Sequence, residues 1–300
     1  MAFAQHSEHT SPTRRTLLAV IVWLLVVAPA VTQGIEVETE ASIGNLGFTG
    51  DRSASDTDLG SGTYPWDARF AVRGTVLDGF LLTGAYERDS VLKNTVSVTL
   101  GYTGQIMSVA AGPFVGFILD SDNPYLLKPG LSAALRAELW EVGFLALETD
   151  VTLDPTLSTN ETDFRQFRIN PQAGLYIPNI ITTIEFDRST LFYTDGPDAT
   201  TDRRSEYALA TEIFQKAIPY RILLRFAYRS EQKDFADGTT HALGAAVFTP
   251  GFTYAPNEGL TLRAELENGV YVFGREDLLG EFESDRYFFR ATVGATIAIP

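Results

Sequence analysis

The fold is decided by the last stretch of the chain, residues 286–299, which read RYFFRATVGATIAI. Apolar side chains fall on every second residue from Tyr287 through Val293 to Ile299, and the positions between them include Arg286 and Arg290. Strict alternation over this length indicates a β-strand with one apolar face and one polar face. The sequence therefore predicts a long amphipathic strand at its end.

The same alternation recurs from residue 31 onward, with no convincing helical period. In the run near residue 220, Ile222, Leu224 and Phe226 share one face, whereas Arg221 and Arg225 share the other. Fourteen such runs begin near Ile35, Trp66, Phe80, Thr95, Ile106, Leu131, Gly143, Arg165, Ile180, Glu206, Tyr220, His241, Leu260 and Arg286. We expect fourteen antiparallel strands, with twelve to sixteen as the range, and a bulge at Pro250 in the twelfth run.

Short and long connections alternate along the chain. The six short ones carry turn residues or leave little room, at 77–79, 104–105, 140–141, 178–179, 217–219 and 255–259. The seven longer ones are polar, near residues 50–64, 88–93, 118–128, 152–162, 194–204, 232–239 and 274–285. In an up-and-down sheet this alternation places every short turn at one end, which is the layout of barrels in the bacterial outer membrane.

The size of the sheet indicates which face is inside. Fourteen strands enclose more space than apolar side chains can fill, so the apolar face is predicted to face lipid. A soluble sandwich of two sheets is the alternative, because it also buries apolar faces. Aromatic residues on the apolar face gather at the strand ends, as in two interfacial girdles, which favours the transmembrane barrel. The predicted girdle residues are Trp66, Tyr86, Tyr102, Tyr207, Tyr228, Tyr254 and Tyr287.

The polar face of the predicted strands carries ten arginines and fifteen carboxylates. Cross-strand ion pairs that brace the wall and a charged, water-filled pore are both expected from this composition. The predicted pore-lining residues are Arg69, Arg73, Arg136, Glu138, Glu148, Arg168, Glu185, Glu212, Arg221, Arg225, Arg263, Glu265 and Arg290.

The first thirty residues indicate an export signal. Arg14 and Arg15 precede the apolar run 17–27, and the small residues at 28–30 predict cleavage after Ala30. An uncleaved membrane anchor is the alternative, but the apolar run is short and Pro29 would interrupt a helix. The region around Arg14 also loosely resembles a twin-arginine signal, although the general secretory route is favoured. We expect a mature barrel of residues 31–300 in the outer membrane of a Gram-negative-type envelope.

Composition argues against several functions. The chain has no Cys and only three His, so thiolate chemistry and multi-histidine metal sites are not expected. A net charge of −15 argues against a nucleic-acid partner. His241 is the one histidine of the predicted mature chain, and neither it nor the half calcium-loop pattern at 120–123 makes a catalytic or metal site. We expect no enzyme activity and no cofactor.

Over residues 31–300 the chain resembles the bacterial outer-membrane β-barrel class and is similar in length and strand count to monomeric fourteen-stranded porins. The resemblance is architectural and rests on no catalytic or binding motif. It implies outer-membrane lipid and the barrel-assembly machinery as partners. Many such barrels end in an aromatic residue that this machinery reads, whereas this chain ends in Ala298-Ile299-Pro300.

The function expected from these features is a pore for passive diffusion of small hydrophilic solutes or ions. Fifteen inward carboxylates against ten arginines predict a mild preference for cations. A surface-exposed structural, adhesin or binding barrel without a conducting pore is the alternative, since nineteen acidic residues lie in or beside the long loops against nine basic ones. A transporter of hydrophobic compounds fits less well, because the first strand begins too close to residue 31 to leave room for a plug.

Overall fold

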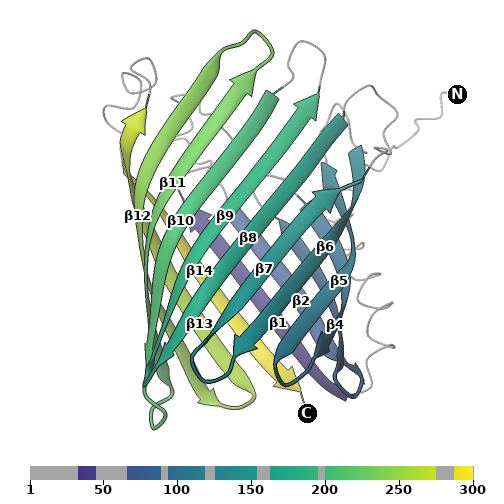
Figure 1. Cartoon of the computed structure of the whole chain (residues 1–300), viewed down its shortest axis with the longest axis vertical. Helices are drawn as coiled ribbons and strands as arrows, with labels where there is room; N and C mark the ends of the chain where they lie inside the picture. Colours follow the sequence, from purple (N-terminus) through teal and green to yellow (C-terminus); the bar gives the residue numbers. More distant parts are fainter. Residues whose placement is uncertain are drawn as a thin grey trace, which may run out of the picture.

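A computed structural model describes residues 33–44, 66–88, 94–118, 126–153, 163–194, 200–274 and 287–299. These residues form fourteen strands, shown in Figure 1: β1 (Gln33–Gly44), β2 (Trp66–Leu77), β3 (Phe80–Arg88), β4 (Asn94–Thr103), β5 (Met107–Ile118), β6 (Leu126–Leu139), β7 (Gly143–Thr152), β8 (Asp163–Ile177), β9 (Ile180–Thr194), β10 (Thr200–Phe214), β11 (Tyr220–Phe235), β12 (Thr240–Asn257), β13 (Leu260–Gly274) and β14 (Tyr287–Ile299). In these ranges no helix is long and apolar enough to cross a membrane. The predicted leader, its cleavage site, Arg286 and most residues of the long loops lie outside them.

The strands form a closed barrel. Each strand pairs antiparallel with its neighbours in the sequence, and β1 also pairs with β14, from Ile35 opposite Ile299 to Gly44 opposite Arg290. Closure gives every strand a partner on both sides, so no edge is left for pairing with another chain. The predicted fourteen-stranded up-and-down barrel is therefore confirmed, and the two-sheet sandwich is wrong.

The short connections all lie at one end of the barrel, which is the lower end in Figure 1 and also holds the C-terminal end of β14. They fall at residues 78–79, 104–106, 140–142, 178–179, 215–219 and 258–259, where short turns were predicted. Three of them contain left-handed backbone, at Gly79 (φ 76°), Trp140 (φ 52°) and Asn179 (φ 62°). Glycine and asparagine adopt this conformation at the lowest cost, so these residues suit tight turns.

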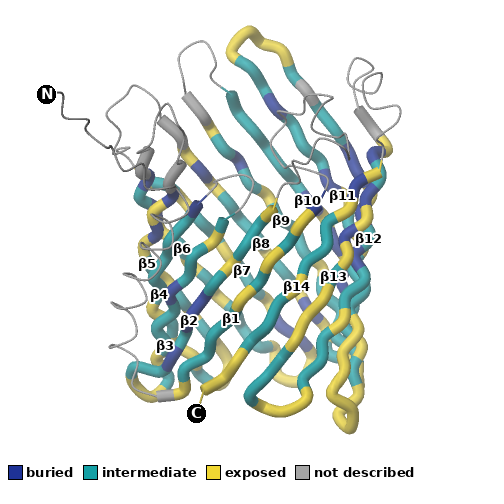
Figure 2. The backbone as a smooth tube through the Cα atoms, turned by 180° about the vertical axis from the view of Figure 1, so that it is seen from behind, coloured by how far each residue is buried: buried dark blue, intermediate teal, exposed yellow. Residues whose placement is uncertain are grey.

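The two faces of the wall follow the predicted alternation. On β11, Ile222, Phe226 and Tyr228 are exposed on the outer surface, whereas Arg229 is buried inside and Arg225 lines an internal cavity. Successive side chains of a strand point to opposite faces, so this pattern assigns the whole strand. Many apolar residues of the strands are exposed, and Figure 2 shows exposed positions along the whole height of the wall. These apolar side chains form the outer surface of a transmembrane barrel.

Two predicted loops are partly strand. β10 begins at Thr200 rather than near Glu206, and β11 and β12 continue to a turn at 236–239 where a loop over 232–239 was predicted. The reason is that these extensions carry polar residues on both faces: Arg203 and Asp234 form an outer-face ion pair of 2.6 Å between β10 and β11. The apolar alternation therefore stops before the strands do.

The predicted bulge at Pro250 is also wrong. Pro250 pairs in register with Leu224 of β11, and the pairing of β12 with β13 resumes at Gly251 opposite Glu265 without an inserted residue. The shifts in the β12–β13 register lie elsewhere, between Gly244 and Ala245 and between Tyr254 and Asn257. Proline removes one donor from the ladder, but the alternation of side chains continues through it.

Part of the interior is packed rather than open. Ala245, Val247, Tyr271 and Phe288 form a buried apolar cluster inside the wall of β12–β14. The ring of Phe288 lies against Gly269, where an added Cβ would come 2.0 Å from the ring's Cζ atom. Phe144 covers Gly174 and Phe114 covers Gly130 in the same way. Glycine at these inward positions lets an aromatic ring from the neighbouring strand lie against the backbone, so these rings brace the wall without filling the barrel.

A pair of adjacent leucines tests the assignment of faces. Leu224→Arg puts a charge on the outer face among Ile222 and Phe226, and should lower the free energy of unfolding in lipid vesicles by ~2–4 kcal/mol. Leu223→Arg is the matched control, because Leu223 lines the internal cavity, and it should cost less than half as much. Equal losses in urea titrations of the two variants would show that the outer face does not meet lipid.

Candidate functional site

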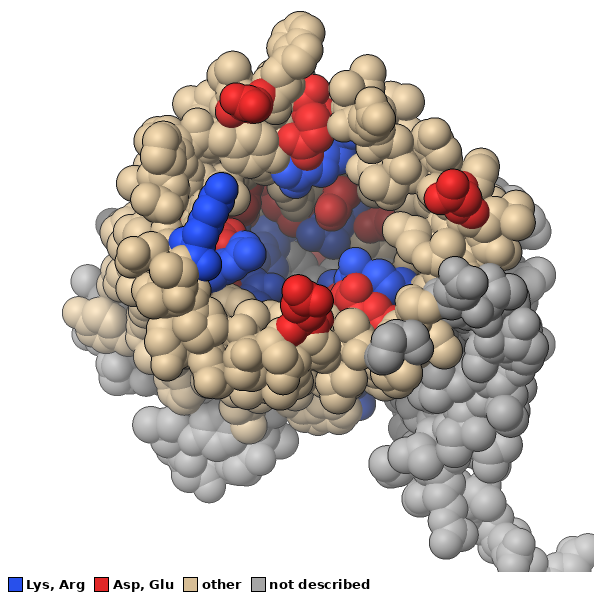
Figure 3. Space-filling model, turned by 90° about the horizontal axis from the view of Figure 1, so that it is seen from below, with Lys and Arg blue, Asp and Glu red and all other residues tan. Residues whose placement is uncertain are grey.

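The barrel contains a charged cavity of about 470 Å³. Seen from the short-turn end in Figure 3, the molecule is hollowed at its centre and the wall of the hollow carries basic and acidic side chains. The charged lining residues come from nine strands and comprise Glu40, Asp67, Arg69, Glu87, Arg88, Arg168, Glu185, Asp187, Arg204, Glu206, Arg225, Arg263, Glu265, Glu267 and Arg290. The guanidinium of Arg88 lies 3.7 Å from the ring centre of Trp66 on the outer face, so eight carboxylates face six guanidinium groups.

Beside the cavity lies a buried ion cluster centred on Arg229 of β11. Its guanidinium donates from Nε to Glu206 of β10 and from both terminal nitrogens to Glu267 of β13, the latter two at 3.0 Å. The three side chains are only 5–8% exposed. A two-pronged contact of this kind is the strongest arrangement for an arginine–carboxylate pair.

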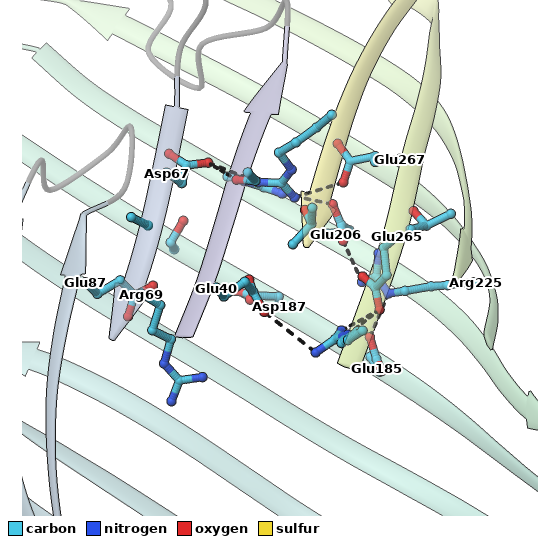
Figure 4. Close-up of a pocket in the computed structure, with 18 of the residues that line it drawn as sticks. Glu40, Asp67, Arg69, Glu87, Glu185, Asp187, Glu206, Arg225, Glu265 and Glu267 are labelled. Carbon is cyan, nitrogen blue, oxygen red and sulfur yellow. Dashed lines mark hydrogen bonds and ion pairs between the residues drawn. The ribbon is translucent and has the colours of Figure 1, made fainter. Parts of the chain in front are cut away.

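The cluster extends to neighbouring arginines. Glu206 also accepts hydrogen bonds from Arg225 at 2.6 Å and from Arg204 at 3.1 Å, so three guanidinium groups share one carboxylate. Glu267 accepts a further bond from Arg290 at 3.0 Å, whose other terminal nitrogen lies 3.5 Å from Asp67 (Figure 4). Each buried charge is thus compensated by an opposite one, as burial of charge requires.

Several of these contacts span two strands rather than one. Arg229 of β11 reaches Glu267 of β13 across Ala245 of β12, which is its register partner. On the other side, Arg225 reaches Glu185 of β9 at 3.0 Å, across the small inward residues of β10. A long guanidinium stem can lie over alanine, whereas a large side chain there would block it. The small residues of β10 and β12 that these contacts pass over are therefore part of the ion network.

A second set of charges is more open. Glu40, Arg69 and Glu87 are register neighbours on β1, β2 and β3, and all line the cavity (Figure 4). Arg263 of β13 joins them across Gly294 of β14, with a terminal nitrogen 3.8 Å from Glu40. Arg263 and Arg69 keep 48% and 43% of their side chains exposed, in contrast to the buried Arg229. We call Arg263, Glu40, Arg69 and Glu87 the alternating row.

The structure separates the predicted pore-lining residues into two groups. Seven of them line the cavity: Arg69, Arg168, Glu185, Arg225, Arg263, Glu265 and Arg290. The other six do not line it. Arg73 pairs with Glu36 and Glu38, Arg221 pairs with Glu212, and Arg136 pairs with Glu138. Arg136 also donates to Tyr176 and lies 3.7 Å from the ring centre of Phe144, and Glu148 is exposed on β7.

Some residues of the site were not predicted as pore-lining. The apolar alternation predicts a strand that begins near Glu206 and so places Arg204 in a loop, whereas β10 begins at Thr200. Asp187 was also missed, although it pairs with Arg168 at 2.8 Å and lines the cavity. Extending the alternation of β10 by one step toward its start would have placed Arg204 on the inward face. No sequence pattern, in contrast, links Arg229 to Glu267, because their contact crosses a whole strand.

Five of the predicted girdle aromatics lie near strand ends, whereas Tyr207 and Tyr228 are register partners in the middle of β10 and β11, because both strands continue past the predicted ends. Five of the seven are exposed: Trp66, Tyr102, Tyr207, Tyr228 and Tyr287. Tyr86 donates to Asn94 at 2.8 Å, and Tyr254 stacks on Tyr220 with ring centres 5.1 Å apart. Tyr220 itself was not predicted to belong to the girdle. Contact of these rings with the membrane interface stays a prediction.

The described residues contain no group of three or more His, Cys, Asp or Glu side chains that could hold a metal ion. His241 lies on β12, in register with Lys233 of β11. The cavity lining is a set of charged pairs, which suits the passage or binding of polar solutes.

Comparison with known proteins supports the fold alone. No family model matches the chain, and no curated protein does. Among solved structures, the CymD monoaromatic hydrocarbon channel has a TM-score of 0.50 at 9% identity, with 92% of each chain covered. The outer membrane channel DcaP of Acinetobacter baumannii has a TM-score of 0.46 at 13% identity, covering 89% of this chain and 96% of that one. OmpT, an outer membrane protein of Vibrio cholerae, has a TM-score of 0.45 at 12% identity, covering 89% of this chain and 98% of that one. The chain thus has the fold of outer-membrane channel barrels.

The buried ion cluster can be tested by removing its central cation. Arg229→Gln leaves Glu206 and Glu267 buried with fewer partners and should lower the free energy of unfolding in urea by ~3–5 kcal/mol. Arg221→Gln is the control, because its pair with Glu212 is half-exposed, and it should cost less than ~1 kcal/mol. Similar losses in the two variants would show that burial adds nothing to the stability of the cluster.

Proposed function

We propose that this protein is an outer-membrane pore for passive diffusion of small hydrophilic solutes or ions. The observation that carries the proposal is the charged cavity inside a closed barrel whose outer surface is apolar. A soluble protein places its charges outside and its apolar residues inside, and this chain does the opposite. The outer-membrane channels that share its fold support the same location and role.

Solvent exposure within the barrel supports passage of water and solutes. Arg263 and Arg69 line the cavity and remain nearly half exposed, although both lie on the inward face of the wall. A guanidinium keeps its charge under all physiological conditions, so the lining stays polar. The rings of Phe114, Phe144 and Phe288 lie against glycines of the neighbouring strands, where an added Cβ would come within 2.1 Å of each ring.

The proposed selectivity is a mild preference for cations. The cavity lining has eight carboxylates against six inward guanidinium groups, an excess of two negative charges, and most of these groups are paired. Paired charges produce a weak field, so the preference should be small and should shrink at high salt, where the Debye length is ~3 Å at 1 M.

The proposal also includes the biogenesis expected from the sequence. Residues 1–30 would direct export and be cleaved, and the mature barrel would be inserted by the barrel-assembly machinery into outer-membrane lipid. No catalytic role is proposed. Most charges of the cavity are paired with one another, which leaves them poorly placed to act as acid or base.

A channel for hydrophobic compounds is the second candidate, because CymD is named as a hydrocarbon channel and this barrel also has an inward apolar cluster. The burial of this cluster, however, argues against a role in binding hydrophobic solutes. Ala245, Val247, Tyr271 and Phe288 are each less than 7% exposed, and none of them lines the cavity. Their apolar surface is used up in packing, so it offers no binding patch to a passing solute.

Planar-bilayer recording of the purified protein tests the pore. We expect stepwise, ohmic currents whose reversal potential under a salt gradient shows a mild preference for cations. Arg263→Gln should strengthen this preference, because it removes an exposed positive charge from the cavity. Arg188→Gln is the matched control on the exposed outer face of β9 and should leave the reversal potential unchanged.

Two results would contradict the proposal. A barrel that is folded in the bilayer but silent would favour the alternative of a surface-exposed binding or adhesin barrel. A clear preference for anions would mean that the carboxylates of the lining are neutralised and the arginines dominate the field.

A further inference from the structure

The alternating row differs from the rest of the lining in its order. Its members come from β13, β1, β2 and β3 and have the signs plus, minus, plus, minus, with only Gly294 of β14 between the first two. Elsewhere in the cavity, Arg225 and Arg290 are each held by two carboxylates within 3.5 Å. The row is the part of the lining where opposite charges stand side by side and stay accessible to solvent.

The two arginines of the row make their shortest ion pairs with carboxylates outside it. Arg263 lies 3.8 Å from Glu40, and its tighter contact is with Glu265 of its own strand. Arg69 is held by Glu38, at 3.1 Å, rather than by the row members next to it in register. Exposed pairs of this kind contribute little to stability, so a solute can replace them at low cost.

From this arrangement we propose that the alternating row is a binding site for small zwitterionic solutes, meaning solutes that carry an ammonium and a carboxylate group together. The inference rests on the proposed pore and names the solute class that its cavity favours. The carboxylate of such a solute would pair with Arg69, and its ammonium would pair with Glu40 or Glu87.

Charge balance is the physical reason for this choice. A solute with one charge that displaces part of an Arg–carboxylate contact leaves the released wall charge uncompensated. A zwitterion supplies both charges and leaves the row balanced. A neutral polar solute offers hydrogen bonds but no charge-assisted contact, which is the stronger kind. The cavity of about 470 Å³ has room for a three-carbon solute together with water.

Two isomeric solutes provide the test. Alanine and lactamide have the same atoms and nearly the same size, but only alanine is zwitterionic at neutral pH. Uptake of each radiolabelled solute into vesicles containing the full barrel is measured at micromolar concentration, where a weak site is far from saturated and binding raises the flux. Because each exposed ion pair contributes little, we expect alanine to enter about threefold faster than lactamide.

Variants locate the site. Arg69→Gln removes the guanidinium between Glu40 and Glu87, and should bring the alanine-to-lactamide ratio close to one. Arg69→Lys keeps the positive charge and should keep most of the preference. Arg203→Gln, which breaks an outer-face pair with Asp234, is the control and should leave the ratio at the wild-type value.

The outcomes separate this inference from the proposed pore. If neither solute enters, there is no pore, and both the proposed function and the inference are wrong. If both enter at the same rate, the pore stands and zwitterion binding is wrong. A preference for alanine that survives Arg69→Gln overturns the assignment to the alternating row, whereas a preference lost in Arg69→Gln and kept in Arg69→Lys supports it.

Discussion

The rest of this structure depends on one constraint, the pairing of every backbone N–H and C=O group within the wall. A lipid bilayer offers no hydrogen-bonding partner, so a sheet can cross it only when its first and last strands meet. In this chain that contact is the pairing of β1 with β14 over ten register positions. Once the sheet is closed, one face becomes the outside of the barrel and the other the inside. Because successive side chains of a strand alternate between the two faces, the position of a residue along its strand decides on which side it lies.

The inside then has to accommodate charge. Fourteen strands enclose more space than their side chains fill, and the inward residues include many arginines and carboxylates. They form pairs that cross one or two strands, and the longer contacts pass over small residues such as Ala245 and Gly294. The same groups that brace the wall thereby keep the lumen polar. Burial divides them: the cluster around Arg229 is closed to solvent, and the alternating row is open to it.

Local pattern predicted the strands well where one face was apolar. The run 286–299 and the run from Tyr220 were both recognised by their alternation, and the short turns were found from their turn residues. The pattern did not predict the strand ends where both faces are polar, so the extensions of β10 and β11 were expected to be loops. It also misjudged Pro250, because a proline can omit its hydrogen bond without shifting the register. These errors have a common cause: alternation reports contact with an apolar phase, whereas a strand continues as long as its backbone is paired.

By itself, the sequence determined the architecture of this protein: the strand count, the side to which each residue points and the end that carries the short turns. These features depend on the residue types and on their alternation along each strand, both of which can be read from short stretches of the sequence. Only the tertiary structure decided which charges meet. Arg229 and Glu267 are 38 positions apart on strands that are not neighbours, and their contact depends on register, on the reach of a guanidinium and on the small residue between them. The cavity, the buried cluster and the alternating row arise from such contacts, so no window of the sequence contains them.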